Sequence, residues 1–237
     1  MGRQKKHGEH TREALLQAAE ALLADGGEQA LSVRAVAERV GTSTRAVYSV
    51  FGSKDGLLSA LGQHGFELLS AVVDELPPTD DPIADIVEGG VMGFRRWWRR
   101  NPRLFRLAFD HLVVAGPGGV KVSQAGLAAL GRLKLRVQRA SDAGLLGGCD
   151  VDEVTAQIEA LCEGLTIVEG RHGPLLHSEP EEIWREALRA LLDGLRGATS
   201  APLPREGGAG GDLSAVALLP GEPGPVGDRS SGPDPPS

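Results

Sequence analysis

Two short amphipathic segments meet at a glycine between Ser32 and Leu58, and their spacing restricts the possible folds more than any other feature of this chain. Ser32 is a candidate N-cap for the first segment, whose apolar residues recur at helical spacing as far as Val40. Gly41 supplies the turn, because glycine reaches left-handed backbone angles at little cost. The second segment covers about residues 43–50. The pattern predicts a helix-turn-helix.

Helical periodicity with capping signals continues as far as residue 197, and signals for β-strands are almost absent. Only 4% of the residues are aromatic, and no long alternation of apolar and polar residues occurs. We therefore predict an all-α fold. Nine helices are expected, at about residues 11–24, 32–40, 43–50, 53–76, 81–100, 102–114, 120–143, 150–171 and 180–195. A loop rich in glycine and proline is expected at 116–119.

The composition changes abruptly after Gly197. Residues 198–237 hold eight glycines and eight prolines, no aromatic residue and a single short apolar patch. Such a segment buries too little apolar surface to offset the entropy lost on ordering the chain. We expect a disordered tail at 198–237, preceded by a flexible basic arm at 1–9 and by domains at 10–70 and 71–197.

Several features of the sequence bear on the cellular location of the protein. No run of 18 or more apolar residues occurs, so no transmembrane span is expected. The basic N-terminus leads into no apolar stretch of the kind that a secretory signal requires. The two cysteines, Cys149 and Cys162, fit a reducing compartment, and Cys162 is expected to be a small buried residue. We expect a cytoplasmic protein with no membrane partner.

The net charge of −7 argues at first against a nucleic-acid partner, but the charges are unevenly distributed. Residues 1–54 carry eight lysines and arginines against six acidic residues. The last 40 residues carry two arginines against five acidic residues. The acidity therefore lies away from the predicted helix-turn-helix, and a local basic face is what contact with phosphates requires.

The second helix of the motif has two different faces. On a helical wheel Ala46, Val47 and Val50 share one face, which we expect to pack inward. The opposite face carries only side chains that form hydrogen bonds, namely Thr44, Arg45, Tyr48 and Ser49. A short polar helix of this kind suits the major groove of DNA. An ordinary solvated helix surface is the alternative for each of these residues taken alone.

Individual side chains suggest a division of roles. Arg45 suits a bidentate bond to guanine, which gives about 1–3 kcal/mol of discrimination between bases. Tyr48 and Lys54 suit phosphates, which fix the register without reading sequence. Ser32 and Ser43 lie near helix N-termini, where a hydroxyl and backbone N–H groups can bind a phosphate.

The segment from Gly41 to Leu58 resembles the tetracycline-repressor (TetR) family of bacterial transcription regulators. The turn glycine, the pair Tyr48-x-x-Phe51, Ser53-Lys54 and the leucines that follow carry the resemblance, which extends over residues 11–70. It implies an all-helical homodimer in which the first three helices bind DNA and the C-terminal helices bind a small molecule and the second subunit. By position, the usual DNA contacts of the family fall on Ser32, Ser43, Thr44, Arg45, Tyr48, Ser49 and Lys54. Many members have a small residue where this chain has Arg45.

The last two predicted helices, 150–171 and 180–195, carry more apolar residues than a terminal hairpin needs for its own packing. We expect them to form a four-helix interface between two copies, whose two-fold symmetry matches a palindromic operator. The recognition helices would then lie about 34–36 Å apart, one turn of DNA, or somewhat further if the dimer splays.

The predicted helix at 81–100 combines aromatic and basic residues. Its wheel places Val87, Val91, Phe94 and Trp98 in one apolar stripe, with the arginines largely outside it as a solvated flank. We favour core packing for these aromatics over a second nucleic-acid or membrane surface. A share in an apolar ligand pocket is the alternative, for which the candidates are Phe94, Trp98, Phe105, Phe109 and His111.

No motif for catalysis or for a cofactor emerges. The histidines, among them His7, His10, His172 and His177, join no cluster with metal-ligand spacing. No nucleophile elbow, phosphate-binding loop or dinucleotide fingerprint occurs. We therefore predict no enzyme, no metal and no cofactor, but a ligand-responsive regulator that represses from a palindromic operator on double-stranded DNA. Two alternatives are a helical small-molecule-binding protein or enzyme with a vestigial helix-turn-helix, and a non-specific DNA-packaging protein, against which the acidic total argues.

Overall fold

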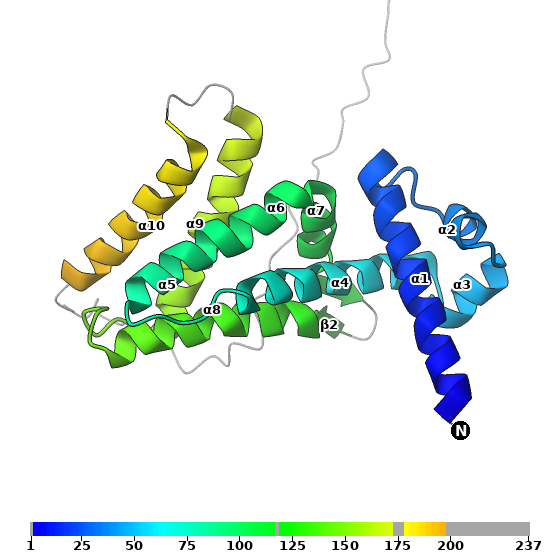
Figure 1. Cartoon of the computed structure of the whole chain (residues 1–237), viewed down its shortest axis with the longest axis horizontal. Helices are drawn as coiled ribbons and strands as arrows, with labels where there is room; N and C mark the ends of the chain where they lie inside the picture. The colour runs from blue at the N-terminus through cyan, green and yellow to red at the C-terminus, as the bar shows by residue number, and fades with distance from the viewer. Residues whose placement is uncertain (1, 117–118, 173–177, 198–237) are drawn as a thin grey trace, which may run out of the picture. The chain divides into compact units, whose positions relative to one another are not determined.

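The computed structural model describes residues 2–116, 119–172 and 178–197, and this part of the chain is helical apart from one short hairpin (Figure 1). The elements in order are α1 (Gly2–Gly26), α2 (Val33–Val40), α3 (Thr44–Phe51), α4 (Lys54–Asp74), α5 (Pro82–Glu88), the π-helical segment η1 (Gly89–Arg95), α6 (Arg96–Arg100), α7 (Pro102–Asp110), β1 (Val113–Gly116), β2 (Gly119–Val122), α8 (Gln124–Asp142), α9 (Val151–His172) and α10 (Pro180–Gly197). Because α5, η1 and α6 follow without a break, the described residues form the nine helices expected. The all-α prediction is confirmed.

Several helices begin at a side-chain N-cap of a residue type that is recognisable in the sequence. The hydroxyls of Ser32, Ser43 and Ser53 each accept a hydrogen bond from the backbone N–H three residues later, at 3.1, 3.2 and 2.9 Å. Asp81 accepts from two N–H groups at the start of α5, and Pro82 follows it at the first helical position. These caps satisfy backbone donors that have no partner within their own helix.

The structure differs from expectation at the N-terminus. Helix α1 begins at Gly2 and not near Thr11, so residues 2–9, expected to be a flexible arm, are helical. The predicted tail at 198–237 lies outside the described residues.

A second difference is the antiparallel hairpin β1–β2, in which Val113 pairs with Val122 and Val114 with Lys121. It replaces the end of the helix predicted at 102–114 and the start of the one predicted at 120–143. Valine favours extended backbone because its branched Cβ restricts the side chain in a helix. Four-residue strands are too short for an alternation pattern to reveal them. Ser123 then caps α8, accepting from the N–H of Gly126 at 3.2 Å.

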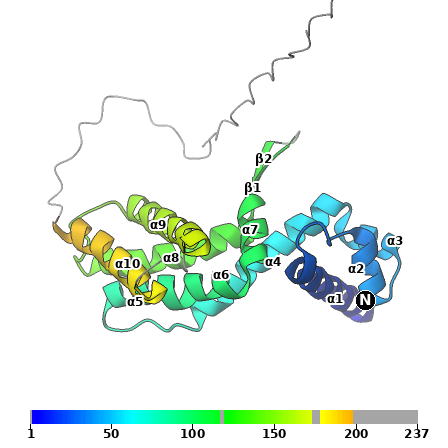
Figure 2. The ribbon, with the colours of Figure 1, turned by 90° about the horizontal axis from the view of Figure 1, so that it is seen from above.

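The hydrophobic core has three parts. The first joins α1, α2, α3 and the start of α4, and it includes Leu104 and Leu107 of α7. The second joins α5, η1, α8, α9 and α10 around Trp184. The third lies between them, where Phe66 and Leu69 of α4 meet α6 and α7. Helices α4 and α7 thus contribute residues both to the N-terminal core and to the middle one. In Figure 2, α4 runs from the helices α1 to α3 toward α7 and α8.

Within the described residues, no helix combines the length and the hydrophobicity that crossing a bilayer requires.

Candidate functional site

The helix-turn-helix is held by buried residues of α2 and α3. Val36, Ala37 and Val47 are almost fully buried against α1 and α4. Between the helices Gly41 has a φ of 72°, a left-handed conformation in which a side chain would be strained. The Gly41 turn directs one face of α3 into the core and leaves the other face at the surface.

All seven residues predicted to contact DNA are exposed. They come from the starts of three successive helices and from the outer face of α3, and they are Ser32, Ser43, Thr44, Arg45, Tyr48, Ser49 and Lys54. Half of the Tyr48 surface is exposed, which is unusual for a large aromatic side chain in a small domain. Ser32 and Ser43 use their oxygens as N-cap acceptors, so each hydroxyl keeps its proton for donation to a further acceptor.

Some of the basic side chains near this face form ion pairs with acidic residues, and others do not. Arg34 pairs with Glu38 at 2.8 Å, and Arg39 pairs with Asp25 at 3.3 Å. Arg45 and Lys54 have no ion-pair partner within residues 2–116, 119–172 and 178–197. Positive charges without a carboxylate partner in the described part of the chain therefore lie at the start of α3 and at the start of α4.

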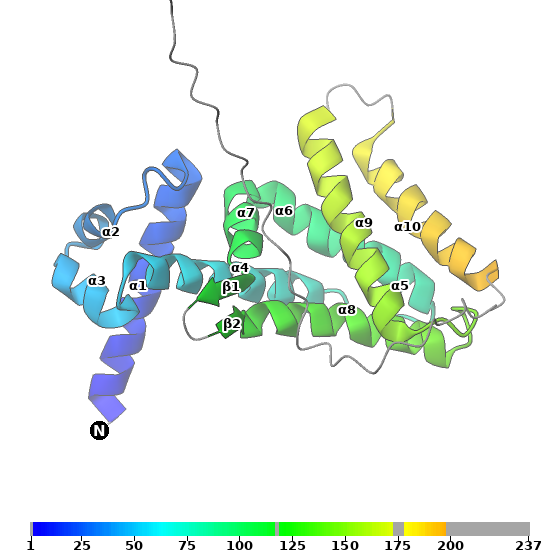
Figure 3. The ribbon, with the colours of Figure 1, turned by 180° about the vertical axis from the view of Figure 1, so that it is seen from behind.

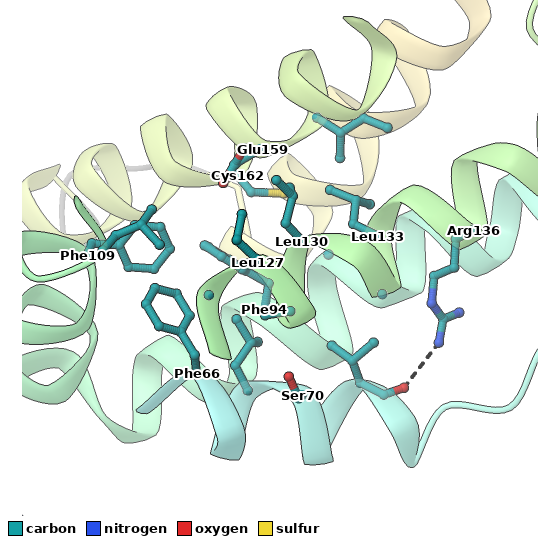
Figure 4. A pocket seen from close by; sticks show the side chains of 18 residues that line it. Phe66, Ser70, Phe94, Phe109, Leu127, Leu130, Leu133, Arg136, Glu159 and Cys162 are labelled. Atoms are coloured by element: carbon teal, nitrogen blue, oxygen red, sulfur yellow. Dashed lines mark hydrogen bonds between the residues drawn. The ribbon is translucent and has the colours of Figure 1, made fainter. Parts of the chain in front are cut away.

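A second candidate site is a cavity of about 150 Å³ enclosed by α4, η1, α7, α8 and α9 (Figure 4). Its lining is mostly apolar, with phenylalanines at one end and leucines of α8 along one side. The polar side chains that reach it are Ser70, Arg136, Glu159 and Cys162. An apolar hollow with a few polar groups is typical of a small-molecule site.

Two glycines shape this cavity. A Cβ on Gly90 would lie 2.7 Å from the Cδ1 atom of Leu188, and one on Gly126 would lie 2.3 Å from the Cδ1 atom of Leu112. A larger residue at either position would push its neighbouring leucine aside. Both glycines line the cavity, so the close packing that they permit sets its shape.

The comparisons with known proteins agree with this geometry. Residues 15–61 match the family model for bacterial regulatory proteins of the tetR family. This match covers the second half of α1, all of α2 and α3, and the first turns of α4. Residues 15–61 thus carry the sequence pattern of the TetR family. No curated protein matches the chain.

Solved structures share the TetR fold beyond the matched segment. A protein of unknown function from Rhodococcus sp. RHA1 is 24% identical with a TM-score of 0.68, over 78% of this chain and 95% of that one. The TetR-family regulator PfmR from Thermus thermophilus is 20% identical with a TM-score of 0.53, over 76% and 98%. The fatty acid degradation regulator FadR from Bacillus halodurans is 15% identical with a TM-score of 0.59, over 78% and 96%. At these identities the likeness shows the fold alone.

In this TetR fold, only two of the five candidate ligand residues line the cavity, Phe94 and Phe109. Phe105 lies behind them, with ring centroids 5.8 Å from Phe94 and 4.5 Å from Phe109. Trp98 packs in the middle part of the core, outside the lining. The ring of His111 instead hydrogen-bonds through Nδ1 to the Leu107 carbonyl at 3.0 Å, at the end of α7.

The π-helical segment η1 explains why the helical-wheel prediction placed Arg95 at the surface. A π turn bonds residue i to i+5 and thus inserts one extra residue, so side chains after it are displaced relative to a regular α-helix. Trp97, and not Trp98, is fully buried as a result, and Arg95 turns into the protein with only 5% of its surface exposed. The prediction of a solvated arginine flank was wrong for Arg95.

Buried Arg95 forms a bidentate ion pair with Glu169 of α9, at 2.8 and 2.9 Å. Arg99 and the indole N–H of Trp184 also donate to this carboxylate, each at 2.9 Å. Burial opposes the ionisation of Glu169, but the hydrogen bonds and the charge of Arg95 outweigh it and lower the pKa of that carboxyl. This network joins η1 and α6 to α9 and α10.

Sequence reasoning missed the polar residues of the cavity. Burial raises the pKa of Glu159, and it raises the pKa of the Cys162 thiol to about 12, with smaller contributions from Glu163 and Glu159. One signal was available, because Glu159 is next in sequence to Ile158, which belongs to the apolar stripe of α9. Within the described residues no group of three or more His, Cys, Asp or Glu side chains is placed to hold a metal ion.

Proposed function

We propose that the chain is a homodimeric transcription repressor that binds a palindromic operator and is released from it by a small-molecule effector. The observation that carries this proposal is the exposed polar face of α3, on which Arg45, like the neighbouring Lys54, has no carboxylate partner among the described residues. A helix presented in this way matches the dimensions of the major groove.

Contacts to DNA are proposed residue by residue. Arg45 reads a base edge, most simply a guanine, from the first turn of α3. Thr44, Ser49 and Tyr48 contact the groove or its phosphates from the same face, and Lys54 binds a phosphate from the start of α4. Ser32 and Ser43 place a hydroxyl beside the N-terminal N–H groups of α2 and α3, where a phosphate is stabilised.

Four exposed side chains on one recognition helix give too few base contacts for secure specificity, so a dimer is required. Helices α9 and α10 lie side by side (Figure 3) and are proposed as the interface. Their outer surface includes Ile167 and Val168 of α9, which are 50% and 46% exposed. Burying such side chains against a second copy would stabilise the pair by about 25 cal/mol for each Å² of apolar surface.

Release by an effector can be explained by α4 and α7, because each of these helices contacts both the N-terminal core and the cavity. Helix α4 contributes Leu57 and Leu61 to the N-terminal core and Phe66 and Ser70 to the cavity wall. A ligand that prefers one arrangement of α4 and α7 would therefore shift the population of α3 orientations. The Bacillus halodurans structure, which shares this fold, is that of a fatty acid degradation regulator.

The test is a gel-shift assay of the purified dimer against DNA that flanks its own gene. A specific complex at about 100 mM salt supports the proposal, and it should be lost in the double variant Arg45→Ala/Lys54→Ala. Arg100→Ala removes a positive charge from α6, outside the helix-turn-helix, and serves as the matched control that leaves binding intact. A folded dimer that retards no duplex specifically would overturn the proposal.

A further inference from the structure

The cavity holds an acidic side chain that the protein itself does not use. Glu159 lines the cavity from α9, and no described residue donates a hydrogen bond to its carboxyl or pairs with it. Most of the side chains around it are apolar, and Ile158 and Cys162 of the same helix are among the lining residues. A carboxylate in such surroundings is costly unless a positive charge or a hydrogen-bond donor accompanies it.

We propose that the cavity takes an effector with a basic nitrogen, bound as a cation against Glu159 with its apolar body between the phenylalanines. The inference rests on the proposed function, since it names the chemical class of the ligand for that same site. Four observations support it: the carboxyl of Glu159 has no partner among the described residues, phenylalanine rings line one end of the cavity, the hydroxyl of Ser70 lies on the opposite wall, and the guanidinium of Arg136 is already hydrogen-bonded to backbone carbonyls.

The aromatic end of the cavity suits the apolar body of such a ligand. Phe66, Phe94 and Phe109 contribute their rings, with centroids 5.2 Å apart for Phe66 and Phe109 and 6.1 Å for Phe94 and Phe109. A cavity of about 150 Å³ admits a group the size of benzene.

The wall opposite Glu159 offers one more polar group. Ser70 of α4 is 8% exposed, and its hydroxyl has no hydrogen-bond partner among the described residues. In Figure 4 it lies across the cavity from the α9 side chains Glu159 and Cys162. A hydroxyl accepts a hydrogen bond from an ammonium as readily as from a neutral donor. A ligand N–H group therefore has an acceptor on either wall.

The one cationic side chain of the lining is already engaged. Arg136 donates to the Val73 carbonyl at 3.1 Å, to the Leu76 carbonyl at 2.7 Å and to the Asp85 carbonyl at 3.2 Å. These bonds, one of them drawn in Figure 4, hold its guanidinium against the connection from α4 to α5. A fatty carboxylate would have to compete with them and would meet Glu159 as a like charge.

A second acidic residue of α9, Glu163, lies outside the cavity lining but interacts electrostatically with Glu159. Burial raises the pKa of Glu163 and of Glu159, and for Glu163 the neighbouring Glu159 adds to the effect. Neither carboxyl has a basic partner among the described residues. A cationic ligand would relieve the cost of ionising these groups, whereas an anionic ligand would increase it.

The experiment compares three probes of similar size by isothermal titration calorimetry of the full chain at pH 7.5 and fixed ionic strength. They are 2-phenylethylamine, which is a cation, phenylacetate, an anion, and 2-phenylethanol, which is neutral. The amine should bind at least tenfold more tightly than either of the others. Equal or tighter binding of phenylacetate or 2-phenylethanol, or no binding of the amine at millimolar concentration, would overturn the inference.

Two variants locate the effect. Glu159→Gln keeps the size of the side chain and should reduce the preference for the amine to less than threefold while 2-phenylethanol binds as before, which shows that the cavity is intact. Glu153→Gln makes the same chemical change at an exposed position of α9 and should keep the full preference. A preference retained by Glu159→Gln would overturn the assignment of this carboxyl.

DNA binding is measured separately, so that the two proposals fail in different ways. If the chain binds its operator and phenylacetate binds the cavity best, the ligand class is wrong and the regulator stands. If no specific DNA is bound while the amine occupies the cavity through Glu159, the regulator is wrong and the site remains a cation-binding site.

Discussion

The guanidinium of Arg103 donates a hydrogen bond of 3.2 Å to the backbone carbonyl of Leu23, and it also bonds to the carbonyl of Ala24. Arg103 lies in α7, which carries Phe109 of the cavity wall, whereas Leu23 lies in the last turns of α1. The last carbonyls of a helix lack partners within the helix and carry partial negative charge. An arginine of α7 therefore caps the C-terminal end of α1.

Arg103→Ala should weaken this junction. The bonds are partly exposed to solvent, so we expect a loss of about 1 kcal/mol in the free energy of unfolding. Urea titration measures that loss, and hydrogen exchange should become faster in residues 23–27. Arg106→Ala, an exposed arginine of the same helix, is the control. Equal effects from the two variants would show that Arg103 has no special role.

His64 links α4 to α1 through Glu20, with 3.4 Å between Nε2 and Oε2. The hydrogen bond to Glu20 raises the pKa of His64 above its ordinary 6.5 although burial opposes it, and Glu67 adds a smaller contribution. A raised pKa means that the protonated form stabilises the fold. This stabilisation is complete below pH 6.5 and is lost as the pH rises through the pKa of the folded protein. The unfolding free energy should fall over this range in the wild type, and less steeply in His64→Gln.

Glu169→Gln should be strongly destabilising. It removes the buried carboxylate that binds Arg95 through two bonds and leaves only the half-exposed Glu181, at 3.1 Å, as an ion-pair partner of that guanidinium among the described residues. Breaking a buried pair costs about 3–5 kcal/mol. Because the pKa of Glu169 is lowered, its stabilisation is present above its ordinary pKa of 4.5 and is lost as the pH falls through the lower pKa of the folded protein. Asp193→Asn breaks an exposed pair with Arg196 and should cost less than about 0.5 kcal/mol, as judged by the same urea titration.

The two thiols should differ in reactivity. Burial raises the pKa of Cys162 to about 12, so almost no thiolate forms near neutral pH, and the side chain is buried. Cys149 is only half-buried. A thiol reagent such as DTNB should therefore modify one cysteine in each native chain, and Cys149→Ala should remove that reaction. Rapid modification of both cysteines in the native state would contradict the burial of Cys162.

The sequence predicted the helix-turn-helix because local rules determine it. Serine caps, the Gly41 turn and the apolar face of α3 are all readable from neighbours in the chain, and the structure has them. The exposure of Arg45 and Tyr48 follows from the same wheel. Their role in DNA binding stays a prediction.

The cavity could be predicted only in part, because it depends on a departure from regular helix geometry. The π-helical segment moves Arg95 inward and buries Trp97 more fully than Trp98, which the wheel places in the apolar stripe. No wheel of 100° per residue anticipates that shift. Glu159 was missed because its surroundings come from helices distant in sequence. The hairpin was missed because its strands have four residues each.

The central claim, that the outer face of α3 reads DNA, is tested most directly by measuring operator affinity against salt concentration for wild type, Lys54→Ala and Arg45→Ala. Fluorescence anisotropy between about 50 and 200 mM salt gives the slope of log K against log salt. Lys54→Ala should lower the slope by about 1 and weaken all sequences equally, because it removes one phosphate contact. Arg45→Ala should relax the preference at one base step by about 1–3 kcal/mol. If both variants bind the operator and its single-base mutants as the wild type does, α3 is not the reading surface.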